Sequence, residues 1–169
     1  PWGSDARLAG LGTRLHRASS SRAGATPFSL APALAPSPLM DDAILVAVAG
    51  AHLSGEPLNH QLTARGGTLA RACKTAPRYR LFALPDTTPP KPGLLRVDTG
   101  AAIDVEVWRL SPAAFGAFVA AIPSPLGIAK IELEDGEQVS GFVCESHATV
   151  GAKDISSFGG WRAFRRTRR

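Results

Sequence analysis

The sequence predicts an α+β protein in which a small, strongly curved or barrel-like mixed sheet carries helices on its outside. Its apolar runs suit about six strands and three helices, which come in mixed order along the chain. Two of the strands are joined around residues 98–100, and two others flank Asp135-Gly136, which is a strong hairpin signal. The chain has 169 residues, 44% of them hydrophobic, which is enough for one domain with its own core.

The first predicted elements are a strand, a helix and a second strand. Residues 43–49 form an uninterrupted apolar run, which is typical of a buried strand. Residues 57–65 are predicted as a helix, because Pro57 suits a first turn and Gly66 begins a Gly-Gly stop. The segment "RYRLFALP" (78–85) alternates polar and apolar residues and therefore predicts a strand.

The second half continues with two strands, a helix, a hairpin and a C-terminal element. Ser111 and Pro112 form an N-cap and a first-turn proline, and they predict a helix over "AAFGAFVAAI" that ends before Pro123. The other predicted elements are strands at 94–97, 103–110, 130–134 and 138–145, and a terminal helix or turn within 154–166.

Composition divides the chain into three parts. Residues 1–39 hold a short amphipathic helix with leucines at helical spacing, followed by an Ala/Pro/Ser-rich linker. A helix with nothing to pack on, followed by a linker, indicates the end of an upstream domain. Residues 40–164 form the predicted domain, and residues 165–169 form a basic tail.

Charge argues against a nucleic-acid partner. The formal net charge is +5, but five arginines lie within the last eight residues, and the remaining chain has as many acidic as basic residues. A solvated C-terminus is therefore the simpler interpretation of the tail.

The chain has no run of about 18 apolar residues, which argues against a membrane span. Two cysteines are too few for a disulfide framework, so we expect a reduced, cytoplasmic protein.

Motifs for cofactors and nucleophiles are absent from the sequence. It has no phosphate-binding G-x-x-x-x-G-K-[ST], no dinucleotide-binding G-x-G-x-x-G and no G-x-S-x-G nucleophile elbow. No pair of histidines or cysteines has the usual metal-ligand spacing, so we expect neither a metal nor a cofactor.

The stretch "GAHLSG" (50–55) is the first candidate site. It joins a buried strand to a helix, and a glycine-containing turn of this kind presents backbone N–H groups that favour anions. His52 stands at its centre. The alternative is a tight turn whose histidine only packs or caps.

Polar residues elsewhere extend this candidate site. Lys91 lies in the proline-stiffened loop "PPKPG", Arg78, Tyr79 and Arg80 begin a strand, and Asn59 follows the "GAH" turn. The charged side chains among them are equally compatible with solvated surface positions.

Several long motifs carry a resemblance to a known family. "GAHLSGEPLNHQL", "TAPRYRLFALPDTTPPKPGLLRV", "IPSPLGI", "GFVCE" and "DISSFGGWRAF" together resemble the C-terminal domain of allophanate hydrolase over about residues 43–164, in the family's order. The leading helix and linker resemble the end of that enzyme's amidase domain. The resemblance implies a γ-glutamyl cyclotransferase-like fold, a small mixed β-barrel with flanking helices.

The resemblance also implies a reaction. The amidase domain of such an enzyme converts allophanate to N-carboxycarbamate, and the C-terminal domain decarboxylates this small dicarboxylate in urea or s-triazine breakdown. The family's catalytic histidine lies in its GAHL motif, which makes His52 the expected proton-transfer residue. The expected substrate-binding residues are Gly50, Ala51, Leu53, Asn59, Tyr79, Arg80 and Lys91, with Arg78 as an alternative to Arg80.

Other functions stay open at this point. Cyclotransferases of this fold use a glutamate soon after the strand that corresponds to "VEVWRL", and the following "SPAAFGAFVAAIPSPLGI" has no acidic residue, which argues against action on γ-glutamyl amines. A non-catalytic module that stabilises or assembles the enzyme is the main alternative, because N-carboxycarbamate also decays unaided. A homo-oligomer is likewise left open.

Overall fold

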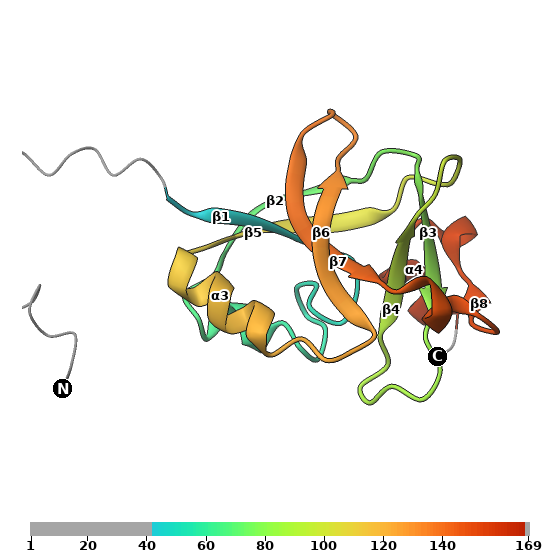
Figure 1. The fold of residues 1–169 in the computed structure, drawn as a ribbon, viewed down its shortest axis with the longest axis horizontal. Helices are drawn as coiled ribbons and strands as arrows, with labels where there is room; N and C mark the ends of the chain where they lie inside the picture. Colours follow the sequence, from blue (N-terminus) through green and yellow to red (C-terminus); the bar gives the residue numbers. More distant parts are fainter. Residues whose placement is uncertain (1–41, 168–169) are drawn as a thin grey trace, which may run out of the picture. The chain divides into compact units, whose positions relative to one another are not determined.

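The computed structural model describes residues 42–167, whose strands form two sheets (Figure 1). The larger sheet contains β1 (Ile44–Val48), β2 (Thr68–Lys74), β5 (Asp104–Leu110), β6 (Leu126–Glu132) and β7 (Gln138–Cys144), in the order β2-β5-β1-β7-β6. Strand β1 lies at its centre, antiparallel to β5 and parallel to β7. The apolar run predicted as a buried strand is therefore confirmed as the middle of the sheet.

The smaller sheet has three antiparallel strands. Strand β3 (Tyr79–Ala83) lies between β4 (Pro92–Arg96) and the two-residue strand β8 (Lys153–Asp154). Figure 1 shows this sheet at the end of the domain opposite α3 (Pro112–Ala120), with α4 (Trp161–Arg166) beside it. The other short helices are α2 (His60–Thr63), η1 (Ser146–Thr149) and η2 (Ser156–Phe158).

The predicted α+β class with a curved mixed sheet is confirmed, but the sheet does not close into a barrel. Its two edge strands, β2 and β6, approach each other only where they end. An isolated bridge joins Thr75 to Leu133, and the N–H of Ala76 donates to the carbonyl of Glu132 at 2.9 Å. A closed barrel needs a continuous ladder between its edges, which this local contact does not supply.

Both sheets and the helices share one hydrophobic core. Tyr79, Leu81, Val107, Phe118 and Ile155 are among its fully buried members, and they come from β3, β5, α3 and the chain that follows β8. Helix α3 begins as predicted, because the Ser111 hydroxyl accepts the N–H of Ala114 at 3.2 Å and Pro112 opens the helix. Among residues 42–167, no helix is long and apolar enough to cross a membrane.

Strand β6 begins earlier than predicted, at Leu126 instead of residue 130, and two other elements differ more from the sequence prediction. The helix predicted at 57–65 shortens to His60–Thr63, because the residues before it form consecutive turns with hydrogen bonds such as Glu56 N–H to the Leu53 carbonyl at 2.9 Å. Strand β2 was not predicted: six of its seven residues are exposed, so its sequence, TLARACK, lacks a buried face that would produce alternation.

Candidate functional site

The turn that follows β1 packs closely against β4. A Cβ atom at Gly50 would lie 2.3 Å from Cγ and Cδ of Pro92, so only glycine allows the two segments to approach this closely. Pro92 directly follows Lys91. The close approach therefore brings the GAH turn, residues 50–58, and the loop that carries Lys91 to one place.

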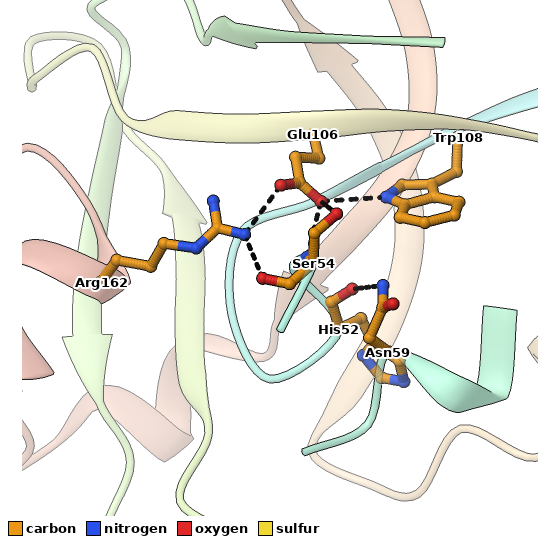
Figure 2. Close-up of polar contacts among 6 residues, drawn as sticks. All are labelled: His52, Ser54, Asn59, Glu106, Trp108 and Arg162. Atoms are coloured by element: carbon orange, nitrogen blue, oxygen red, sulfur yellow. Dashed lines mark hydrogen bonds and ion pairs between the residues drawn. The ribbon is translucent and has the colours of Figure 1, made fainter. Parts of the chain in front are cut away.

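Hydrogen bonds fix the shape of the GAH turn. The N–H of Leu53 donates to the Gly50 carbonyl at 2.9 Å, and the N–H of Leu58 donates to the Ala51 carbonyl at 2.8 Å. The Asn59 side-chain amide donates to the His52 carbonyl at 2.9 Å (Figure 2). The backbone of His52 is thus held from both sides, which gives its imidazole a defined direction.

A cavity of about 270 Å³ opens beside this turn. Its polar side chains are those of His52, Gln61, Thr88 and Lys91, and no carboxylate is among its lining residues in the described part of the chain. The rest of the wall is apolar, and it comprises Val48, Ala49, Gly50, Ala51, Leu58, Pro89, Pro92, Leu94, Phe118, Ala121, Ile122, Pro123, Leu126 and Phe142.

His52 is the central side chain of the cavity. Its Nε2 lies 2.9 Å from Oε1 of Gln61, so with this amide orientation the imidazole is the donor. The ring stacks on Phe142 with centroids 5.0 Å apart and meets the edge of Phe118 at 5.2 Å. Burial lowers the pKa of His52; the hydrogen bond to Gln61 opposes this effect, and the charge of Lys91 adds to it. Burial therefore favours a neutral imidazole.

Lys91 brings a positive charge to the same cavity. Its backbone N–H donates to the Thr87 hydroxyl at 2.9 Å, which fixes the start of the side chain. No carboxylate within residues 42–167 forms an ion pair with its ammonium group. A half-buried lysine whose ammonium has no counterion among the described residues is suited to an anionic ligand.

The opposite side of the GAH turn carries a buried carboxylate. Glu106 on β5 is 4% exposed. It accepts hydrogen bonds from the Ser54 N–H at 2.8 Å, the Ser54 hydroxyl at 2.9 Å and Trp108 Nε1 at 3.2 Å, and it pairs with Arg162 at 2.8 Å (Figure 2). Burial alone would raise the pKa of Glu106, but the hydrogen bonds from Arg162 and Ser54 hold it below its ordinary value.

The structure brings four of the predicted site residues together. Gly50, Ala51, His52 and Lys91 all line the cavity. These are the residues of the two loops that approach at Pro92.

The other predicted binding residues lie elsewhere, and their placement at the cavity is corrected. Leu53 is a core residue, and Asn59 braces the turn instead of lining the cavity. Tyr79 is fully buried, and its hydroxyl accepts the N–H of Glu132 at 2.9 Å. Arg80 is exposed, 3.9 Å from Asp154, and its neighbour Arg78 is also exposed. Alternation along β3 explains both positions, because Tyr79 faces the core and Arg80 faces solvent.

Sequence reasoning missed Gln61, Phe118, Phe142 and Glu106. Only Glu106 had a local signal, since it is a lone acidic residue between Val105 and Val107 in a strand that is otherwise apolar at that point. Such a carboxylate in a buried strand needs several donors. The other three reach the cavity from segments far apart in the chain, which no local pattern shows.

The fold and the cavity together define an α+β domain whose pocket holds His52 and Lys91 against an apolar wall, and Lys91 has no carboxylate partner among residues 42–167. Within this class the chain belongs to the allophanate hydrolase C-terminal domain family, whose model matches residues 44–166.

Relatives place this domain in chains of very different length. Urea amidolyase of Saccharomyces cerevisiae is 44% identical over 126 residues, which cover 72% of this chain and 7% of the relative. The structure of Kluyveromyces lactis allophanate hydrolase is 42% identical with a TM-score of 0.73, over 75% of this chain and 22% of that one. A protein specific to uropathogenic E. coli is 36% identical with a TM-score of 0.68, and the match covers 73% of this chain and 96% of that one.

Proposed function

We propose that this domain decarboxylates N-carboxycarbamate to carbamate and carbon dioxide, with His52 as the proton-transfer residue, in cytoplasmic urea or s-triazine nitrogen release. An upstream amidase domain would supply the substrate. The observation that carries the proposal is that His52 and the unpaired ammonium of Lys91 line one cavity. Membership of the allophanate hydrolase family supports the choice of substrate.

The cavity has the features that a small dianion needs at one end. N-carboxycarbamate has two carboxylates on one nitrogen, and Lys91 would neutralise the carboxylate that stays. The GAH turn, which also lines the cavity, adds backbone groups beside the same position. No carboxylate among the described lining residues repels the substrate or competes for the ammonium.

His52 would supply the proton that the reaction consumes. As carbon dioxide leaves, the C–N bond breaks and its electron pair stays on nitrogen, and a proton from the imidazolium converts this nitrogen to the amino group of carbamate. Burial lowers the pKa of His52, but a bound dianion favours the protonated form. Substrate binding would therefore charge the acid that the step requires, and such catalysis typically contributes about 10²–10⁴-fold.

The apolar wall suits the departing group. A carboxylate that becomes carbon dioxide loses its charge, and its negative charge moves to nitrogen near His52. Phe118 and Phe142 contact the imidazole and line the same cavity. A carboxylate held against these rings has little solvation to lose, so its conversion to an uncharged product is favoured.

Malonate tests the substrate class without turnover, because it replaces the central NH of N-carboxycarbamate by CH₂. Titration of this chain with malonate, followed by ¹H–¹⁵N NMR, is expected to shift signals of residues 50–52 and 91 and to raise the pKa of His52. Neutral malonamide is the matched control and should do neither. Equal shifts for both compounds, or shifts remote from the cavity, would argue against a dicarboxylate site.

A further inference from the structure

We propose that helix α4 acts as a clamp on the GAH turn, and that Arg162 and Arg165 are positioning residues for the reaction at His52. Both arginines belong to the arginine-rich C-terminal segment, whose simplest interpretation from sequence is a solvated end. The proposal rests on the function proposed for His52. It concerns residues that do not line the His52 cavity.

Two side chains of α4 reach the turn at different points. The Arg162 guanidinium donates to the Ser54 carbonyl and to Oε1 of Glu106, the latter at 2.8 Å (Figure 2). The Arg165 guanidinium pairs with Glu56 at 2.6 Å, where the Glu56 side chain is 14% exposed. The turn is therefore tied to α4 two and four residues after His52.

Glu106 completes the connection to the sheet. Its carboxylate accepts both the N–H and the hydroxyl of Ser54, while Arg162 contacts both Glu106 and the Ser54 carbonyl. Ser54 thus has its backbone N–H, carbonyl and hydroxyl all bonded to this pair. A shift of the turn would break several charge-assisted hydrogen bonds at once.

The clamp itself is anchored in the core. Trp161 and Phe164, on the other positions of α4, are each 2% exposed, and their rings lie 5.7 Å apart. Phe164 also packs on Phe158, with centroids 5.4 Å apart. Because α4 is fixed on its apolar side, its two arginines hold the turn against the body of the domain.

His52 lies in the same turn, so the clamp also determines the position of its imidazole. Its imidazole must stay within hydrogen-bond distance of Gln61 and in contact with Phe142. Misplacing a catalytic group by about 1 Å can cost on the order of 100-fold in rate, even when the cause lies far from the chemistry. Loosening the clamp should therefore lower kcat while Lys91 and the rest of the binding cavity remain in place.

The test compares the double variant Arg162→Met/Arg165→Met with Arg71→Met. Arg71 is a matched control, because it lies on the exposed strand β2, outside the turn, and also forms ion pairs, with Asp135 and Glu137. We expect the double variant to lose about 100-fold in kcat with little change in KM. We also expect the NMR-measured pKa of His52 to rise towards its ordinary value as the ring becomes more solvated. Arg71→Met should leave both quantities unchanged.

Exchanging the two charges of the Arg165–Glu56 pair distinguishes loss of the pair from poor folding of the variant. Arg165→Glu should lower kcat, and the exchange Glu56→Arg/Arg165→Glu should recover it by restoring the pair in reverse. If the folded Arg162→Met/Arg165→Met variant keeps the wild-type kcat and the wild-type pKa of His52, the clamp is overturned. The His52 pKa is measured without substrate, so it tests the clamp even if the chain fails to accelerate decarboxylation, which would count against the proposed function alone.

Discussion

The two sides of the GAH turn differ in how their charged side chains are paired. On the side of β5, the Glu106 carboxylate has four hydrogen-bond donors, one of which is the paired Arg162. On the cavity side, Lys91 has no carboxylate partner within residues 42–167, and His52 contacts two aromatic rings. The paired carboxylate stabilises the fold, whereas Lys91, which has no carboxylate partner in the described part of the chain, is the residue proposed to bind an anionic ligand.

Removing the paired carboxylate is expected to have the largest effect on stability. Glu106→Ala leaves Arg162 and the Ser54 and Trp108 donors without their acceptor, and it should lower the free energy of unfolding by about 3 kcal/mol. Lys91→Met should change it by less than about 0.5 kcal/mol. Urea denaturation of both variants measures the difference. Similar losses for the two would remove the distinction between the sides of the turn.

Lys91→Met should instead affect binding. Losing the ammonium removes the counterion of the retained carboxylate, so kcat/KM for N-carboxycarbamate should fall about 10-fold, which corresponds to about 1.4 kcal/mol. Steady-state kinetics of decarboxylation at two salt concentrations measures this. The difference between wild type and variant should shrink at high salt. A variant with unchanged kcat/KM would indicate that Lys91 is a surface charge.

Two buried tryptophans allow a finer comparison. Trp108 donates to Glu106 at 3.2 Å, whereas Trp161 Nε1 has no hydrogen-bond partner among the described residues. The change to phenylalanine removes a similar volume at both tryptophan positions. Trp108→Phe should therefore cost about 1 kcal/mol more than Trp161→Phe, because it alone breaks a bond to a charged group. Thermal unfolding of the two variants measures the gap, and equal costs would show that this hydrogen bond adds little.

The two sides should also differ in the pH at which they lose stability. His52 has a lowered pKa, so the unfolded chain binds this proton more tightly, and stability should decline as pH falls below about 6.5. Glu106 also has a lowered pKa, so its contribution is present above about 4.5 and is lost as pH falls below that value. Urea denaturation between about pH 8 and pH 2.5 should show the upper decline absent in His52→Asn and the lower one reduced in Glu106→Gln.

The sequence predicted most of the large sheet and the loops of the site. An apolar run located β1, the Asp135-Gly136 step located the β6–β7 hairpin, and the glycines around His52 located the turn. Strand β2 was missed because an exposed edge strand has no apolar face to show. Tyr79 and Arg80 were assigned to the site for their ability to bind carboxylates, but a strand turns successive side chains to opposite faces.

The partners of His52 were beyond sequence reasoning. Phe118 comes from α3 and Phe142 from β7, and neither position differs locally from an ordinary core residue. The pairing of Arg162 and Arg165 was hidden for a related reason, because a cluster of arginines without neighbouring acids indicates a solvated segment. Their partners Glu106 and Glu56 lie more than fifty residues away in the chain.

The central claim, that His52 promotes decarboxylation in this domain, can be measured directly by ¹³C NMR. A separate amidase domain would generate labelled N-carboxycarbamate from allophanate, and its decay would be followed alone, with this chain, and with His52→Ala. Thermal unfolding would verify that the variant is folded. The account predicts faster decay, by about 100-fold or more, with the wild-type chain only. Equal decay in all three samples would contradict it and leave the domain a non-catalytic module.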